Sequence, residues 1–355
     1  MGCGPSIRIG RRMKELVDDI NAWLAAGVTQ LAVATVLSTW GSAPRKVGAK
    51  MVFSADGKFI TGSVSGGCVE GAVISVGEEV LMTGRPQLLR FGVTDETAWE
   101  VGLACGGTIE VLVDQFDFEI YHAMREWIAG ARSGAVITVI RGPEEMVGHR
   151  IAIEDGRIVT GSLDRTLDTI LPPLVDEFPV STRHVLHEDL EVFIDVMQPS
   201  PKLVIVGGAH IAVVLAQLGK LMSYQVILVD PRRAFGSQSR FPGVDRLIQD
   251  WPDKALAEIR LNQDSAVVTL SHDPKIDDPA LAMALDSPAF YIGALGSRKT
   301  HARRCERLIA LGYSEMQIAR IYAPVGMDIG ADNPEEIALA VMGQIVAVYR
   351  SLLET

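Results

Sequence analysis

The feature that most constrains the fold is an immediate succession of strand, glycines, helix and strand after residue 201. It reads "KLVIVGGAHIAVVLAQLGKLMSYQVILVDPRRAF" over residues 202–235. The same rhythm returns in "SAVVTLSHD", in "AFYIGALGSRKTHARRCERLIALG" and in "IARIYAPVG", before a last long helix. Strands that alternate with helices in this way form a parallel sheet with helices on both faces. We therefore predict a Rossmann-like domain.

The first half of the chain has a different pattern, in which strands arrive in runs. An opening helix over residues 11–27 precedes a strand, a hairpin around Asp56 and Gly57, and a helix that begins at or just after Cys68. Such grouping is typical of an α+β domain. The stretch "MQPSPK" then breaks the pattern with two prolines. We predict an α+β domain over residues 1–198 and a Rossmann-like domain over residues 199–355.

The charge of the chain argues against polyanionic partners. Lys and Arg number 33 against 44 Asp and Glu, a formal net charge of −11. We expect neither nucleic acid nor an anionic membrane to be a partner. No apolar run reaches the roughly 18 residues of a membrane helix, so we predict a cytoplasmic protein. The start "MGCGPS" matches the myristoylation pattern, which leaves acylation of Gly2 open.

The four cysteines lie far apart, without the spacing of a zinc site or a disulfide framework. Two of them stand beside glycine pairs. Cys68 follows Gly66 and Gly67 and leads into a helix, whose amide dipoles would lower the pKa of the thiol and make it a nucleophile or metal ligand. Cys105 instead precedes its glycine pair, Gly106 and Gly107, and an apolar strand pattern follows. The alternative is that these cysteines only pack in the core.

The glycine-rich turn of the second half suits a dinucleotide, with Gly207 and Gly208 after a strand and Asp230 where a ribose-binding acid belongs. However, Ala209 stands where a second glycine lets a pyrophosphate approach the backbone, and shifting the frame puts His210 there. We therefore expect NAD(P) not to bind in the ordinary pose. The alternative is a scaffold, or a pocket for another ligand.

Two basic turns are candidate anion sites. In "GALGSRKTHARR" a strand ends before Ser297 and a helix opens with Arg298 and Lys299, so helix amides and cations meet at the carboxyl end of the sheet. In "STWGSAPRKVGAKMVF" the residue Arg45 lies in a turn between strands. Ordinary solvated surface is the alternative for both. No serine, histidine and aspartate set for hydrolysis can be assembled from the sequence.

Taken in order, several motifs resemble the xanthine dehydrogenase accessory protein family, XdhC/CoxI. They are "GSAPRKVGAKM", "GSVSGGCVEGAV", "CGGTIEVLVD", "VGGAHIAVVLAQLGKLMSYQVILVDPR", "RFPGVD", "YIGALGSRKT" and "PVGMDIGADNPEEIALAVMGQIVA". The resemblance implies an XdhC/CoxI-type domain followed by a Rossmann domain. It also implies an assembly chaperone, not a metabolic enzyme. Such a chaperone binds the molybdenum cofactor, as molybdopterin or its cytidine dinucleotide, supports its sulfuration by a cysteine desulfurase, and inserts it into a client molybdoenzyme.

The resemblance carries the cofactor-handling role onto five positions of this sequence: Cys68, Glu70, Cys105, Gly106 and Gly107. Cys68 and Cys105 are then candidate molybdenum contacts, which agrees with the preference of this metal for soft ligands. The basic residues Arg45, Arg298 and Lys299 are candidates for the pterin phosphate.

The chain departs from the family pattern at two places. Ala209 replaces a glycine, and Gln344 stands where an acidic residue is common, which we expect to alter a surface contact.

Two other functions stay open: an NAD(P)-dependent oxidoreductase that uses the Rossmann domain, and a sulfur carrier that holds a persulfide on Cys68. They differ in what they predict, because the first requires saturable nucleotide binding and the second a sulfur adduct. The sequence names neither the client enzyme nor the cofactor variant. A homodimer is expected only because homodimers are common among soluble proteins.

Overall fold

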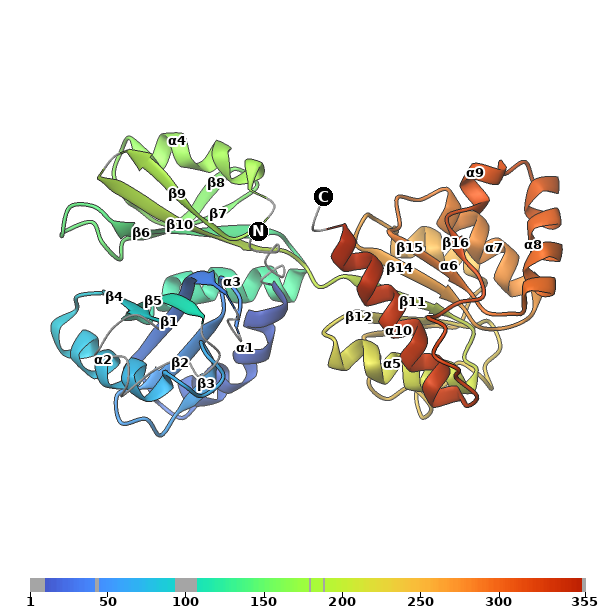
Figure 1. Ribbon diagram of the computed structural model, residues 1–355, viewed down its shortest axis with the longest axis horizontal. Helices are drawn as coiled ribbons and strands as arrows, with labels where there is room; N and C mark the ends of the chain where they lie inside the picture. Colours follow the sequence, from blue (N-terminus) through green and yellow to red (C-terminus); the bar gives the residue numbers. More distant parts are fainter. Residues whose placement is uncertain (1–9, 42–44, 93–106, 179, 188, 353–355) are drawn as a thin grey trace. The chain divides into compact units, whose positions relative to one another are not determined.

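A computed structural model describes residues 10–41, 45–92, 107–178, 180–187 and 189–352 (Figure 1). The chain divides into two compact units, Met1–Pro199 and Ser200–Thr355, and each is described by itself. Among the described residues, no helix combines the length and the apolar character needed to cross a membrane.

The N-terminal unit contains two five-stranded antiparallel sheets. Sheet A has the order β3-β2-β1-β5-β4, with β1 Leu31–Trp40, β2 Lys50–Ser54, β3 Ile60–Gly62, β4 Gln87–Phe91 and β5 Thr108–Gln115. Alternate residues of its strands point to one face, where they form a core with helix α2 (Glu70–Thr83). The expected hairpin around Asp56 and Gly57 is the β2–β3 pair.

Sheet B has the order β8-β7-β6-β10-β9, with β6 Gly134–Arg141, β7 Arg150–Glu154, β8 Arg157–Gly161, β9 Thr182–His187 and β10 Leu190–Met197. Helix α4 (Leu167–Leu174) and the short 3₁₀ helix Val175–Glu177 pack on one face of it. Helices α1 (Gly10–Ala25) and α3 (Phe118–Gly130) share a core with residues of both sheets. The predicted α+β character of this half is confirmed.

Three ion pairs join sheet A to sheet B. Lys50 pairs with Asp195 at 2.8 Å, and the other two pairs are Arg150 with Asp114 and Arg183 with Glu110. A cavity of about 60 Å³ lies between the sheets, lined in part by the first two pairs. Most of its lining is apolar, but its size and the charged side chains of these two pairs suit a few water molecules, because buried charged groups need hydrogen-bonding partners.

The C-terminal unit has a six-stranded parallel sheet C of order β13-β12-β11-β14-β15-β16. Its strands are β11 Lys202–Val206, β12 Gln225–Val229, β13 Arg246–Ile248, β14 Ser265–Thr269, β15 Tyr291–Ala294 and β16 Ile321–Tyr322. This is the strand order of dinucleotide-binding folds, so the Rossmann-like prediction is confirmed.

Helices cover both faces of sheet C (Figure 1). One face carries α5 (His210–Leu221) and α10 (Pro334–Ser351), and the other α6 (Pro252–Ile259), α7 (Pro274–Leu285), α8 (Arg298–Ala310) and α9 (Glu315–Ile318). Strand β11 shows the cause, because Leu203 and Ile205 face the first layer while Val204 and Val206 face the second. Ligands of such sheets bind outside the carboxyl ends of the strands.

Candidate functional site

The loop of residues 63–69, which leads into α2, folds around the carboxylate of Glu70. Seven groups donate hydrogen bonds to this carboxylate: the hydroxyls of Ser63 and Ser65 and the backbone N–H groups of Val64, Ser65, Gly66, Gly67 and Val69. Burial would raise the pKa of Glu70, but these hydrogen bonds lower it more, to about 2. Glu70 is therefore ionised at any physiological pH and holds the loop. Its carboxylate has little capacity left for a ligand.

This loop presents Cys68 to solvent. The N–H of Cys68 donates to Ser65 Oγ at 3.0 Å, and the side chain is exposed. Gly66 and Gly67 have φ of +85° and +120°, which disfavours residues with a side chain, and a Cβ on Gly67 would meet nothing within 4 Å. Open space therefore adjoins the thiol.

Helix α2 begins just after Cys68, as expected. The helix begins at Glu70 with Val69 as its N-cap, so Cys68 precedes the first turn. The thiol therefore belongs to the loop at the helix start, one residue before the N-cap, and not to the helix itself.

The strand directions bring the N-terminal motifs to one end of sheet A. Trp40, the last residue of β1, lies opposite Thr108, the first residue of β5. Strand β3 runs in the same direction as β1. Ser63 follows the end of β3, and its N–H donates to the carbonyl of Lys50, the first residue of β2. The turn that holds Arg45 precedes Lys50. The turn with Arg45, the loop with Cys68 and the approach to β5 therefore share one end of the sheet.

Arg45 is exposed there, and Gly107, directly before β5, is buried. Cys105 and Gly106 lie outside the described residues. In the described ranges, no three His, Cys, Asp or Glu side chains are grouped as ligands of one metal ion.

In the C-terminal unit, the two glycines after β11 are required by neighbouring loops. Gly207 has φ of +101°, and a Cβ there would lie 2.7 Å from the backbone nitrogen of Ser271. A Cβ on Gly208 would collide with the carbonyl of Phe235. Ala209 is the N-cap of α5 with φ of −65°, which any residue adopts. The glycine pair thus serves packing between loops.

Asp230 is fully buried and its carboxylate is engaged on both oxygens. The N–H of Gly208 donates to it at 2.7 Å, and Arg232 donates through its backbone N–H at 2.8 Å and its guanidinium at 2.8 and 2.9 Å. Burial would raise the pKa of Asp230, but these hydrogen bonds hold it below its usual value. The guanidinium of Arg232 also stacks on Phe235, 4.3 Å from the ring centre. A ribose hydroxyl therefore has no free carboxylate oxygen to bind.

His210 begins α5 and is largely exposed, with Nε2 at 3.6 Å from Glu335 Oε1. An acidic side chain thus stands near the helix end where a dinucleotide would place its pyrophosphate, which opposes such binding.

Titration with NAD⁺ or NADH is expected to give no saturable binding, because Asp230 is committed to Arg232 and Gly208 and because Glu335 faces the start of α5. Isothermal titration calorimetry of the full chain measures this. A dissociation constant in the micromolar range would contradict it and restore the oxidoreductase hypothesis.

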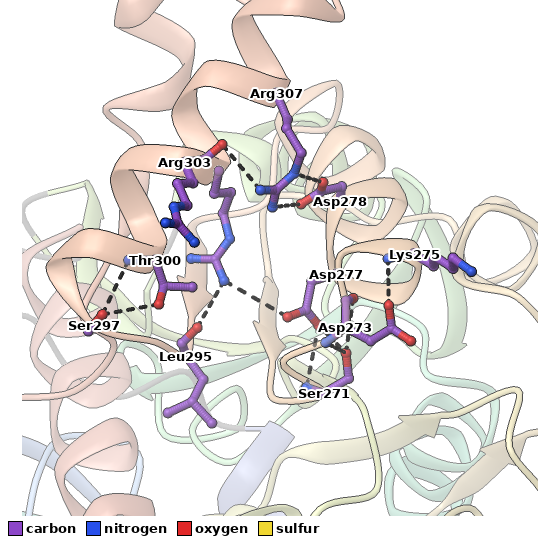
Figure 2. A network of polar contacts seen from close by, with 11 residues as sticks. Ser271, Asp273, Lys275, Asp277, Asp278, Leu295, Ser297, Thr300, Arg303 and Arg307 are labelled. Atoms are coloured by element: carbon purple, nitrogen blue, oxygen red, sulfur yellow. Dashed lines mark hydrogen bonds and ion pairs between the residues drawn. The ribbon is translucent and has the colours of Figure 1, made fainter.

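A polar network lies where β14 and β15 end (Figure 2). Ser271 Oγ donates to Asp277 Oδ1 at 2.6 Å and accepts from the N–H of Asp273 at 3.1 Å. As predicted, β15 ends before Ser297, which is the N-cap of α8 and accepts from the N–H of Thr300 at 3.2 Å. Arg298 and Lys299 follow as exposed residues of the first turn.

Sequence reasoning missed Arg232, Arg304, Ser271 and Asp277. The signal for Arg232 was its place two residues after Asp230 in "VDPRR". For Arg304 it was the distance of seven residues from Ser297, two helical turns, which puts both on one face of α8. The partners of Ser271 and Asp277 come from packing that no local pattern reveals.

Comparison with known proteins gives consistent matches over both units. Residues 23–92 match the model of the XdhC and CoxI family, and residues 203–345 match that of the XdhC Rossmann domain. The chain is 31% identical to a probable xanthine dehydrogenase subunit of Bacillus subtilis, over 89% of this chain and 92% of the relative. It is 27% identical to the molybdenum cofactor insertion chaperone PaoD of Escherichia coli, over 88% and 82%. A solved structure of a xanthine dehydrogenase from Bacillus halodurans superposes with a TM-score of 0.75 at 25% identity, covering 94% of this chain and 96% of that one.

Proposed function

The chain belongs to the XdhC and CoxI family, and from this membership we propose that it binds the molybdenum cofactor as cargo, protects it and inserts it into a client molybdoenzyme of the xanthine dehydrogenase type. The observation that carries the proposal is the exposed Cys68 on a loop fixed by Glu70, with Arg45 at the same end of sheet A. This region falls within the segment matched by the family model.

In this proposal the thiolate of Cys68 ligates molybdenum, since soft metal centres prefer sulfur ligands. The open space at Gly67 lets the bulky pterin approach the loop backbone. Arg45 neutralises part of the negative charge of the cargo. In the same proposal, Cys105, Gly106 and Gly107, which precede β5 in the sequence, also take part in handling the cofactor. Glu70 acts by positioning Cys68 and does not bind the cargo.

The client and the sulfur source extend the proposal. One relative is named as part of a xanthine dehydrogenase and another as a cofactor insertion chaperone, which supports a client of that class. We propose that a cysteine desulfurase supplies the terminal sulfur while the chaperone holds the cofactor.

An anaerobic binding experiment tests the proposal. The full chain is incubated with molybdenum cofactor and passed through gel filtration, and pterin and molybdenum are assayed in the protein peak. Wild type is expected to retain both near stoichiometrically, whereas Cys68→Ser loses molybdenum because a hydroxyl is a poor ligand for a soft centre. Cys305→Ser is the matched control, since Cys305 lies in the other unit.

Each outcome bears on a different part of the proposal. If wild type retains neither pterin nor metal, the cofactor assignment fails. If Cys68→Ser retains as much molybdenum as wild type, Cys68 is not a ligand. If Cys305→Ser loses the metal equally, the loss is not specific to the Cys68 loop.

The exposure of Cys68 also supports a second candidate, a sulfur carrier. Here the Cys68 thiolate attacks the outer sulfur of a desulfurase persulfide, takes that sulfur as its own persulfide and releases the desulfurase thiolate. Mass spectrometry of the protein after incubation with desulfurase and cysteine detects the added sulfur. An unmodified Cys68, or full client activation by Cys68→Ser, would exclude this role.

A further inference from the structure

The side chain of Arg304 is buried with part of its hydrogen-bonding capacity unused. Only 2% of the residue is exposed. Nη2 donates to the carbonyl of Leu295 at 2.9 Å and lies 3.9 Å from Asp277 Oδ2, beyond hydrogen-bonding distance. In the part of the chain that the structure describes, Nε and Nη1 have no acceptor. A buried guanidinium with two unmet donors is costly, so it calls for an acceptor from outside the chain.

The guanidinium lies beneath the turn that opens α8. A helical side chain points back toward the helix start, and Nη2 is 3.8 Å from the position of a Cβ on Gly296. Gly296 itself has φ of +135°, and Ser297 then caps the helix. Figure 2 shows Leu295, Ser297 and Thr300 together at this turn, across from Ser271 and Asp277. The Arg304 guanidinium, which carries the two unmet donors, therefore lies close to the turn that opens α8.

The first turn of α8 carries an unusual charge arrangement. It contains no acidic residue, and it begins with Arg298 and Lys299, neither of which contacts an acidic side chain among the described residues. Cations at a helix N-terminus are disfavoured by the helix dipole, whereas an anion is favoured there. A bound anion would offset the unfavourable interaction between these two cations and the helix dipole. It would receive helix N–H groups and two positive side chains at once.

The nearby carboxylates do not fill this role. Asp278 is paired with Arg307, two turns further along, through a contact of 3.0 Å between Oδ1 and Nη2. Asp277 accepts a hydrogen bond from Ser271, and burial raises its pKa despite the nearby charge of Arg304. The positive charge under the turn is therefore left partly uncompensated.

We propose that the turn of residues 296–300 binds a phosphate monoester, with Arg298 and Lys299 as direct contacts and Arg304 as a buried countercharge that reaches it directly or through one water. This turn and the glycine turn after β11 both lie at the carboxyl edge of sheet C, but they open different helices, α8 and α5, which cover opposite faces of the sheet. Two sources share this chemistry: the phosphate of the pterin cargo and that of a free nucleotide. The pterin source rests on the proposed function, whereas the site itself does not.

Calorimetric titration of the full chain with inorganic phosphate and with cytidine monophosphate tests the site. Wild type is expected to bind at least one of them. The double variant Arg298→Ser, Lys299→Ser, altered only at exposed positions, should bind about tenfold more weakly or not at all, and Arg304→Gln should show a similar loss. Arg303→Gln is the matched control, because it removes one exposed charge from the same helix. It should bind as wild type does.

Two results would overturn the site: no binding of either probe by wild type, or an equal loss in Arg303→Gln and the double variant, which would indicate net charge alone. If Arg304→Gln fails to fold, the test of the site rests on the double variant.

Because the probes contain no pterin, a failure to bind them does not affect the result of the Cys68 experiment. Repeating the cofactor retention assay with the double variant separates the sources. Reduced pterin retention assigns the site to the cargo, and unchanged retention assigns it to a nucleotide.

Discussion

Replacing Asp195 with alanine is expected to lower the free energy of unfolding by about 3 to 5 kcal/mol, because it leaves a buried ammonium without its partner. Lys50 Nζ lies 2.8 Å from Asp195 Oδ2, and the two side chains are 12% and 3% exposed. Among the described residues, the other hydrogen bond of the Lys50 ammonium goes to Thr35 Oγ1 at 3.0 Å. Chemical denaturation of the full chain measures the loss in the transition of the N-terminal unit.

Two further variants test the physical reason. The combination Lys50→Met with Asp195→Leu removes both charges and fills the space with apolar atoms, so most of the stability should return. Glu78→Ala, at an exposed position of α2, should change stability by less than about 0.5 kcal/mol. A loss below about 1 kcal/mol in Asp195→Ala would indicate that water in the cavity between the sheets solvates Lys50 well enough to replace the carboxylate.

Replacing Glu70 with glutamine should destabilise the loop of residues 63–69 by about 2 to 4 kcal/mol, since the amide puts a donor where several N–H groups also donate. The expected results are faster hydrogen exchange at the amides of Ser65, Gly67 and Val69 and a weaker hold on molybdenum in the retention assay. The Cys68 thiol itself remains. Glu78→Gln, on the exposed side of the same helix, is the matched control.

The effect of Glu70 depends on pH with a defined sign. Its pKa in the folded protein, about 2, lies below its ordinary value of 4.5. The stability that it contributes is therefore complete above about pH 5 and is lost as the pH falls toward 2. The difference in stability between wild type and Glu70→Gln should narrow over that range. A difference that stays constant from pH 6 to pH 3 would mean that the carboxylate does not hold the loop by its charge.

The sequence predicted both architectures because each follows from local periodicity. The alternation after residue 201 identified the parallel sheet, and the run of strands before it identified the α+β unit. Local periodicity does not show which residues, distant in the sequence, will contact one another in the fold. Gly208 looked like a phosphate-binding glycine, but the atom that approaches it is the carbonyl oxygen of Phe235, 27 residues further on.

Gln344 illustrates the same limit. We expected this position to alter a surface contact, and that expectation was wrong. Its Oε1 accepts from the hydroxyl of Tyr291 at 2.6 Å and from the N–H of Gly326 at 2.9 Å, which ties α10 to β15 and to the segment after β16. The sequence pattern predicts on which side of a helix a residue lies. It does not predict which distant polar groups that residue will hydrogen-bond. The candidate site at Cys68 was located from its glycines, whereas the clamping role of Glu70 emerged only from the folded loop.

The strand order of sheet A has a consequence for synthesis on the ribosome. Strand β1 finds β2 soon after it emerges, but its other neighbour, β5, follows only after roughly 70 further residues. At about 5 to 20 residues per second, one edge of β1 stays open for roughly 4 to 14 seconds. An open edge of apolar sequence pairs readily with other chains. If the protein is produced in low yield in a foreign host, we expect the cause to be aggregation of the nascent chain through this open edge. Slower elongation between Trp40 and Thr108 would then lower the yield further.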